Sequence, residues 1–391
     1  MEDRKTKVKF IIIEVCNYVD HPPGGQLNFA RLLLRTYGDK VATVGYPNTS
    51  DDPIGKWFEK ADASGAIRDH FNMGPVQTAE TKYFFPRRLR GLIDYIRYSG
   101  KIHEHPCKHF FVQEHALMIG LRKSLVSSVC YRFPGVESQL AKSRFKWAIP
   151  LTRLFDFIFY RATRKADILL ASADEEAVEE MRSKSFGYVD KRDVHFFPTR
   201  VDTEVFKKKS NFKRSGSIRF ISCGRLHWVK GWRLILEALA SLKHDLDFRY
   251  TYVGDGPDRE EFLHAVDELG MADRVELTGF LGPGGIAQRL QHSDLYLMGS
   301  VMEGWPTTLV EAYVVGLPMV TTSVSGARMI VEEGRNGYVC ASRSVDDFLA
   351  CIRRALELDP QEVANFNQPG QYGLVGLRRD LAKHWRFAKI A

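Results

Sequence analysis

Short apolar runs alternate with longer amphipathic runs along most of this sequence. Residues 8–15 and 218–223 are rich in β-branched and aromatic residues, as strands are, whereas residues 27–37 and 232–242 show the periodicity of a helix. Parallel strands need a crossover of a dozen or more residues, which a helix supplies. The alternation therefore predicts an α/β fold with doubly wound parallel sheets.

The same pattern divides the chain into two sets of strands. The first half predicts strands at residues 8–15, 40–45, 109–115, 127–133, 168–172 and 194–198. The second half predicts strands at residues 218–223, 248–253, 275–278, 295–299, 319–322 and 338–341. A single hydrophobic core stops growing at about 250–300 residues, so a chain of 391 residues is expected to split. We expect two Rossmann-like domains facing a central cleft, the default place for a ligand.

A charged stretch without apolar periodicity, KKKSNFKRSG from Lys207 onward, separates the two sets of strands. Such a composition is typical of a linker. We therefore expect a first domain at 1–205, a linker at 206–217 and a second domain at 218–375. The helical pattern at 376–391 follows a turn-rich break, and we expect this C-terminal helix to cross back and pack on the first domain.

The cysteines and the N-terminus bear on the compartment. The six cysteines form no CxxC pair and lie mostly in apolar runs, which predicts reduced core thiols in a cytosolic protein. The apolar run at 8–15 is too short to span a bilayer, and no small-residue cleavage site follows it. We expect a cytoplasmic protein without a signal peptide or a transmembrane helix.

Basic residues gather in the first half of the chain. All of the formal net charge of +8 falls within residues 1–200, and residues 81–165 hold 17 Lys and Arg against 5 Asp and Glu. Aromatic residues are interleaved with these cations at 82–93 and 143–165. Such a segment suits an anionic partner: a membrane surface, a nucleic acid or a phosphorylated substrate. A plain solvated surface, with a core helix at 151–160, is the competing interpretation.

One candidate site follows the strand at 218–223. Gly224 and Arg225 come directly after this strand, and Lys230 stands five residues beyond the arginine on the same loop. Doubly wound sheets bind ligands at the carboxyl ends of their strands. Glycine lets a phosphate approach the backbone, while an arginine fork and a lysine ammonium together suit a diphosphate.

A second motif follows the strand at 295–299. Glu303 and Glu311 have seven residues between them, and a proline lies between the two near a helix start. The loop carboxylate can accept hydrogen bonds from sugar hydroxyls, and the helical one can hold a ribose diol. The free N–H groups of Thr307 and Thr308 are expected to face a phosphate.

Taken together, these motifs resemble the donor domain of the retaining GT-B glycosyltransferases of family four. The matching segments stand in the family's order: 224–226 with 230–231, 253–257, 275–280, 293–295, 303–311, 316–320 and 336–338. The resemblance implies transfer of a hexose-type sugar from a nucleotide sugar with retention of configuration. It implies no cofactor and no obligatory metal.

The resemblance also assigns site residues. Arg225, Lys230 and Glu303 are implied to be catalytic. The implied donor-binding residues are Gly24, Gly25, Gly224, Gly279, Phe280, Leu281, Gly304, Trp305, Pro306, Thr307, Thr308, Leu309 and Glu311.

The first half departs from the family pattern at one place that matters. Arg132 falls where such enzymes commonly carry a His near the transferred sugar. The role of that His is therefore expected to pass to Arg132, or to the Glu114-His115 pair at the end of the preceding strand.

The first domain is expected to bind the acceptor, a glycan or lipid-linked glycan of cell-envelope polysaccharide or lipopolysaccharide synthesis. Residues 81–165 are then expected to meet an anionic membrane surface at the inner face of the cytoplasmic membrane. Two alternatives stay open: a nucleotide-sugar epimerase of similar fold, and a basic nucleic-acid-binding protein. No helix-turn-helix, zinc-finger or RNP signature supports the second, so no nucleic acid is expected as a partner.

Overall fold

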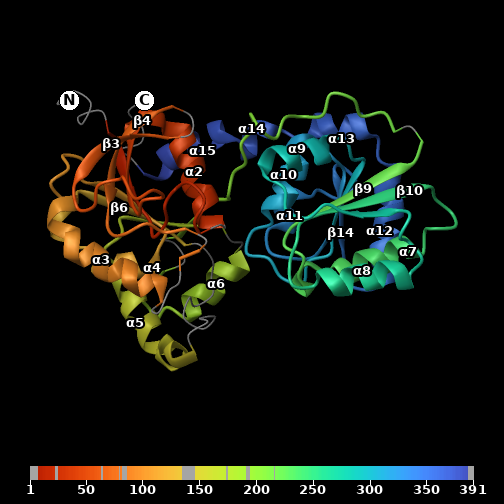
Figure 1. The fold of residues 1–391 in the computed structure, drawn as a ribbon. Coiled ribbons are helices and arrows are strands. Elements are labelled where there is room, and N and C mark those ends of the chain that lie inside the picture. Colours follow the sequence, from red (N-terminus) through yellow and green to blue (C-terminus); the bar gives the residue numbers. More distant parts are fainter. Residues whose placement is uncertain are drawn as a thin grey trace. The chain divides into compact units, whose positions relative to one another are not determined.

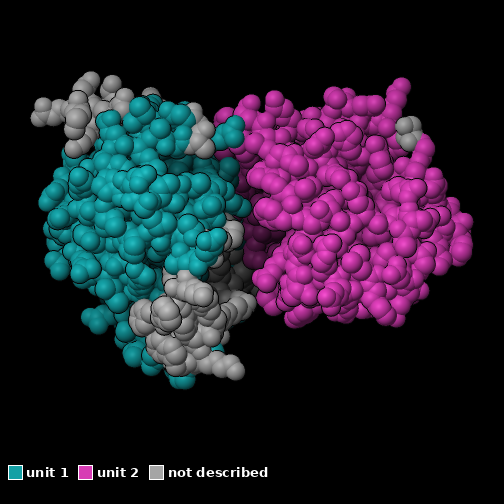
Figure 2. Space-filling model, viewed as in Figure 1, with its two compact units in different colours: residues 1–198, 377–391 teal, residues 199–376 magenta. Residues whose placement is uncertain are grey.

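The computed structural model describes residues 8–22, 25–62, 65–78, 80–81, 86–133, 146–172, 175–190, 194–214 and 216–385. It divides the chain into two compact units, coloured separately in Figure 2. The first comprises Met1–Pro198 with Leu377–Ala391, and the second comprises Thr199–Gly376. Each unit is an α/β sandwich around its own sheet, as Figure 1 shows.

The sheet of the first unit has the strand order β3-β4-β2-β1-β5-β6-β7-β8. Its strands are β1 (Phe10–Ile13), β2 (Val41–Gly45), β3 (Trp57–Ala61), β4 (Ile67–Asn72), β5 (His109–Val112), β6 (Ser128–Phe133), β7 (Ile168–Ala171) and β8 (Val194–Phe196). All neighbours pair in parallel except β3 with β4. The strand order reverses direction between β1 and β5, which makes this the switch point of the first sheet.

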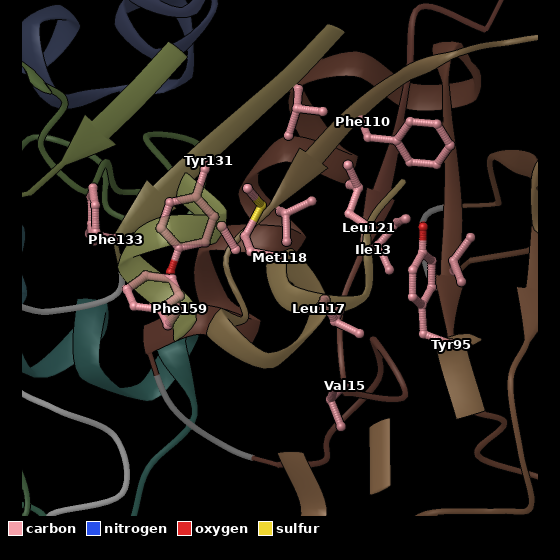
Figure 3. Packing of buried hydrophobic residues seen from close by; sticks show 14 of the residues in the cluster. Ile13, Val15, Tyr95, Phe110, Leu117, Met118, Leu121, Tyr131, Phe133 and Phe159 are labelled. Carbon is pink, nitrogen blue, oxygen red and sulfur yellow. The ribbon is translucent and has the colours of Figure 1, made fainter. Parts of the chain in front are cut away.

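Two hydrophobic clusters flank this sheet. One contains side chains of α2 (Gly25–Tyr37) and α15 (Leu374–His384). The other, part of which Figure 3 shows, contains side chains of α3 (Arg87–Ile102), α4 (His115–Gly120), α5 (Thr152–Thr163) and α6 (Glu175–Ser183). Successive strand-to-strand crossovers of one hand place these four helices on one face of the sheet.

The six strands expected in the first half are all present, and two further strands were missed. The edge strand β3 is half exposed and carries charged residues. Strand β4 reads IRDHFN, and buried polar side chains hide it from a hydrophobic pattern. Those side chains have partners: Arg68 pairs with Asp62, and the His70 ring lies 2.9 Å from Asn72 Oδ1.

The sheet of the second unit is fully parallel in the order β11-β10-β9-β12-β13-β14. Its strands are β9 (Ile218–Cys223), β10 (Phe248–Val253), β11 (Val275–Leu277), β12 (Leu295–Met298), β13 (Met319–Thr322) and β14 (Gly337–Cys340). All six were expected from the sequence. The order reverses between β9 and β12, so the switch point of this sheet lies there.

Helices cover both faces of the second sheet (Figure 1). They are α7 (Trp232–Ala240), α8 (Arg259–Glu268), α9 (Pro283–Gln291), α10 (Thr307–Val315), α11 (Ala327–Ile330), α12 (Val345–Glu357), α13 (Pro360–Phe366) and α14 (Pro369–Tyr372). A short 3₁₀ turn, Trp228–Lys230, precedes α7.

The segment expected to be a linker belongs to the second unit. Phe206 and Phe212 are buried there. Lys209 Nζ donates to the Ser293 carbonyl at 2.7 Å and lies 3.4 Å from Asp294 Oδ1. The expectation of a linker at 206–217 is therefore wrong. Two buried phenylalanines and the paired Lys209 hold this segment on the second unit, although its sequence has no apolar periodicity.

The C-terminal helix packs on the first unit, as expected. Leu377, Leu381 and Trp385 are buried in the cluster that contains α2. The Trp385 ring lies 5.6 Å from that of Phe10, and its Nε1 donates to Ser128 Oγ at 3.0 Å.

The six cysteines are all buried and unbridged, which confirms the expectation of core thiols. Within the described ranges, no helix is both long enough and apolar enough to cross a bilayer.

Candidate functional site

Two loops meet at the switch point of the second sheet. The loop after β9 ends at Gly231, and the loop after β12 begins at Gly299. The N–H of Val301 donates to the Val229 carbonyl at 2.7 Å and joins the loops. Gly231 has a φ of +60°, and a Cβ there would collide with the Gly299 carbonyl oxygen. Only glycine permits this approach, so the sequence keeps the two loops together.

This approach places Lys230 against Glu303. Lys230 Nζ lies 2.7 Å from Glu303 Oε1, and Ser300 Oγ donates to the same oxygen at 2.7 Å. The Ser300 carbonyl in turn accepts a hydrogen bond from Thr322 Oγ1 at 2.6 Å. The Glu303 carboxylate therefore accepts from Lys230 and from Ser300. The structure thus brings together Lys230 and Glu303, two of the expected catalytic residues.

Arg225 lies on the same loop with its side chain exposed. Its backbone is fixed: the Gly224 N–H donates to the Val253 carbonyl at 2.9 Å, and the Arg225 carbonyl accepts from Tyr252 Oη at 3.3 Å. Across the described residues, the Arg225 guanidinium has neither a hydrogen bond nor an ion pair. An anion at this edge would therefore find an unpaired guanidinium on a rigid loop.

Helix α10 begins at the same edge. The N–H of Thr307 donates to the Trp305 carbonyl at 2.9 Å, so the expectation that it is free for a phosphate is wrong. A tight turn at Pro306 brings that carbonyl within reach. No acceptor for the Thr308 N–H occurs in the described part of the chain, and its hydroxyl accepts from Tyr296 Oη at 2.7 Å. One backbone donor thus remains at the helix start.

Glu311 lies one turn further along α10. Its Oε2 is buried and receives no hydrogen bond from any described residue. Burial raises the pKa of this carboxyl to about 8, because the ionised form loses its water. A ligand hydroxyl that donated to Oε2 would satisfy the oxygen and favour ionisation, so the expected contact with a diol stays a prediction with a physical reason.

The loops after β10 and β11 reach the same edge. Gly254 forms an isolated antiparallel bridge with Gly279, whose φ of +74° favours glycine. Phe280 next to it is 83% exposed, whereas Leu281 is half-buried. The exposed phenyl ring of Phe280 suits a planar base. The expected contact with a nucleotide base stays a prediction.

The other expected donor-binding residues differ in exposure. Gly304 is exposed, and a Cβ there would meet open space. Trp305, Pro306 and Leu309 are buried in the second unit, where the Trp305 ring packs over Gly326. These three side chains pack in the interior of the second unit beneath the loop that carries Glu303. Their direct contact with a donor stays a prediction.

A second polar cluster occupies the switch point of the first sheet. Gln113, directly after β5, donates through Nε2 to Glu14 Oε1 at 2.9 Å and accepts from Arg132 Nη1 at 2.9 Å. Arg132 Nη2 also donates to Ser172 Oγ at 2.6 Å, and the guanidinium lies 4.0 Å from the Phe29 ring centroid. All three strand-end side chains, Glu14, Gln113 and Arg132, are buried. Arg132 is therefore fixed at this edge.

The same cluster holds two carboxyls: Glu14, which the sequence analysis did not assign, and Glu114, which it named with His115. Burial and the nearby charge of Glu114 raise the pKa of Glu14 to about 8. Glu114 Oε2 lies 3.2 Å from Arg88 Nε, whereas Oε1 is buried with no hydrogen-bond partner among the described groups. Polar residues directly after apolar strands were the available signal, since strand ends meet at one edge of a parallel sheet.

His115 is a core residue in this structure. It begins α4 rather than ending β5, and its ring centroid lies 3.9 Å from that of Phe159. Tyr131 Oη lies 3.1 Å from its Nδ1. Burial, with Arg88 nearby, holds the pKa of His115 well below its usual range. The prediction that His115 ends strand β5 was wrong. Its catalytic role stays a prediction, and the lowered pKa means that the imidazole would act in its neutral form.

The expected glycine loop is only partly described. Gly24 lies outside the described residues. Gly25 is the first residue of α2, and open space surrounds the position of its absent Cβ. Gln26 beside it donates to the Gln113 carbonyl at 3.2 Å, which ties the start of α2 to the polar cluster.

Comparison with known proteins identifies the second unit. Residues 203–371 match the family model of the glycosyl transferases group 1. The second unit is thus similar to a group 1 glycosyltransferase domain. A putative colanic acid biosynthesis glycosyltransferase, WcaL of Salmonella typhimurium, is 28% identical over 203 residues, which are 50% of this chain and 49% of WcaL. The chain thus matches about half the length of this relative.

Solved structures extend the likeness to both units. Sucrose-phosphate synthase from Thermosynechococcus elongatus superposes with a TM-score of 0.72 at 14% identity, covering 96% of this chain and 98% of that one. HepE of Anabaena in complex with UDP gives 0.68 at 16% identity, covering 96% and 99%. The chain has the GT-B fold.

Among the described residues, no group of three His, Cys, Asp or Glu side chains lies close enough together to hold a metal ion.

Proposed function

We propose that this chain is a retaining glycosyltransferase that moves a hexose-type sugar from a nucleotide sugar to a hydroxyl group of a glycan or lipid-linked glycan. The proposal includes a role in cell-envelope polysaccharide or lipopolysaccharide synthesis. The group 1 match and the name of the relative WcaL support it.

One observation carries the proposal. Three groups lie at the switch-point edge of one parallel sheet: the unpaired guanidinium of Arg225 and the Glu303-held ammonium of Lys230 on the loop after β9, and the free N–H of Thr308 at the start of α10. Two cations and a backbone donor suit a diphosphate, and exposed Phe280 suits its base. The UDP complex of HepE, a protein of the same fold, supports a nucleotide donor.

The chemistry follows from this placement. The bond between the anomeric carbon and the diphosphate oxygen breaks, and its electron pair stays on the diphosphate. The acceptor oxygen then bonds to the same face of the anomeric carbon, and its proton passes to the departing phosphate. Negative charge develops on the leaving group, where Arg225 and Lys230 stabilise it without a metal ion.

The first unit supplies the acceptor side in this proposal. Arg132 is buried and held by Gln113 and Ser172 at a strand end, which suits a fixed donor to a sugar oxygen. It stands where the resemblance expects a His, so we assign it the contact with the transferred sugar.

We further propose that the first unit docks peripherally on the inner face of the cytoplasmic membrane. On α5, Leu154, Phe157 and Ile158 are exposed together with Arg161, at the i, i+3, i+4 and i+7 spacing of one helix face. The interpretation of 151–160 as a core helix holds for the face of Phe155 and Phe159, which are buried in the hydrophobic cluster. Exposed apolar side chains flanked by arginines suit anionic headgroups. Phe84 and Phe85 lie outside the described residues.

Arg225→Ala and Lys230→Ala test the transferase proposal, with Arg353→Ala as a control on the surface of α12. The wild type and the control should be stabilised by one of UDP, GDP or ADP in a thermal-shift panel, by about 2.7 kcal/mol at a hundredfold excess over Kd. Both site variants should lose about tenfold or more in nucleotide affinity, because each removes a charge-assisted contact. Unchanged affinity in both variants would contradict the proposal, as would transfer that EDTA abolishes.

A further inference from the structure

A cavity of about 470 Å³ lies in the first unit, beside the edge strand β3 and the C-terminal end of α3. Lys56, Trp57, Phe71, Lys101, Glu104 and His105 line it. None of them belongs to the polar cluster at the switch point of this sheet. Its volume falls within the range of small-molecule sites.

An aromatic wall forms one side of this cavity and is fixed in place. The ring centroid of Trp57 lies 4.6 Å from that of His105 and 5.4 Å from that of Phe71. Trp57 Nε1 donates to the Lys101 carbonyl at 3.1 Å. His105 Nδ1 accepts from the Cys107 N–H, so its Nε2 carries the hydrogen that points to Asp69 Oδ2 at 3.1 Å. The polar atoms of the wall are satisfied. Phe71 and His105 are buried against Trp57, so the half-buried indole of Trp57 is the ring that offers its surface to a ligand.

The rim carries charged groups of both signs. The side chains of Lys56, Lys101 and Glu104 are exposed, and no ion pair involves any of them within the described residues. The rim therefore offers two ammonium donors and one carboxylate acceptor to a ligand.

This combination selects the chemical class of the ligand. A pyranose ring has an apolar C–H face that packs on an aromatic side chain and an edge of hydroxyls that both donate and accept hydrogen bonds. A simple anion fits less well, because Glu104 and the negative end of α3, which ends at Ile102, oppose it. A purely apolar ligand would leave three charged groups unused.

We propose that this cavity is a glycan subsite that binds one pyranose unit of the acceptor away from the bond-forming centre. The proposal rests on the glycan-transferring function proposed above. The subsite would hold an extended acceptor by a second point, which raises its effective concentration at the switch-point edge.

The test uses the full chain labelled with ¹⁵N, without any nucleotide sugar. The indole N–H resonance of Trp57 is assigned by its loss in Trp57→Phe. The probes are the methyl glycosides of glucose, galactose, mannose, fucose, N-acetylglucosamine and glucuronic acid, with inorganic phosphate as a comparison. We expect at least one glycoside to shift this resonance with saturation, and phosphate to leave it in place.

Lys101→Ala supplies the matched variant, because it removes the ammonium and keeps the backbone carbonyl that holds the indole. It should weaken the glycoside about tenfold, the equivalent of one lost charge-assisted hydrogen bond. Lys207→Ala, an exposed lysine of the second unit, should change nothing.

Three results would overturn the subsite: no shift with any glycoside, equal affinity in Lys101→Ala, or a phosphate effect as large as that of the glycosides. Because the readout needs no transfer, an inactive protein that still shows the shift refutes only the proposed transferase function.

Discussion

The close approach of the two loops at the second switch point makes a quantitative prediction for Gly231→Ala. The alanine Cβ would lie so near the Gly299 carbonyl oxygen that the loops must separate by more than 1 Å before the distance reaches 3.0 Å. A left-handed alanine costs about 1–2 kcal/mol, and overpacking adds about 1–3 kcal/mol. The free energy of unfolding should therefore fall by about 2–5 kcal/mol.

The same displacement should reduce catalysis. Lys230 and Glu303 sit on the two loops that separate, and a misplacement of about 1 Å at a site can cost about a hundredfold in rate. Gly270→Ala is the matched control, since Gly270 has a φ of +62° and only Lys243 Nζ lies within 4 Å of its Cβ position, at 3.6 Å. It carries the left-handed cost without the collision.

Urea unfolding of both variants separates the cost of the left-handed backbone from the cost of the collision. Nucleotide binding and sugar transfer are measured on the folded fraction of each variant. We expect Gly270→Ala to lose about 1–2 kcal/mol of stability and no activity. If Gly231→Ala is no less stable than Gly270→Ala and transfers sugar at the wild-type rate, the loops are not in the arrangement described and the reasoning fails.

Three further predictions concern other parts of the molecule. Burial raises the pKa of Glu311 above that of an unfolded glutamate, so wild-type stability should fall as pH rises from about 4.5 to 8, and Glu311→Gln should flatten this curve by a few kcal/mol in urea melts. Gln113→Leu leaves the buried groups of Glu14 and Arg132 without their bridge and should cost about 2–4 kcal/mol, with nucleotide affinity unchanged in calorimetry; equal stability would contradict the bridge. Leu154→Glu should weaken sedimentation with phosphatidylglycerol vesicles, whereas Leu263→Glu, at another exposed leucine in the second unit, should not.

Sequence pattern predicted those elements whose hydrophobic periodicity is undisturbed. Strands β12, β13 and β14 of the second unit are fully buried in a parallel sheet, and β9 is buried over its last four residues, so short apolar runs in the sequence predict them. Strand β4 escaped prediction because some of its polar residues also have partners distant in the chain, such as Thr43 for His70 and His105 for Asp69. No local pattern contains that information.

The candidate site shows the same division. Arg225, Lys230 and Glu303 could be named because their motifs follow strands that must end at one edge. The contact between Lys230 and Glu303 could not be predicted, because it depends on the close approach of Gly231 to Gly299, 68 positions further along the chain. The position of His115 was predicted wrongly. Helix α4 begins at this residue, and its ring packs against Phe159 in the aromatic core.

The alternation of apolar and amphipathic runs by itself determined two doubly wound units, and the ordered motifs determined which unit matches the group 1 family. Local propensity and periodicity suffice for this, because they act within one element or one turn. Only the tertiary structure decided which polar groups are paired and which remain free. It left the Arg225 guanidinium open, tied Lys230 to Glu303 and buried an oxygen of Glu311 without a partner. Such outcomes depend on distances between segments remote in sequence, and these distances set the electrostatics of the site.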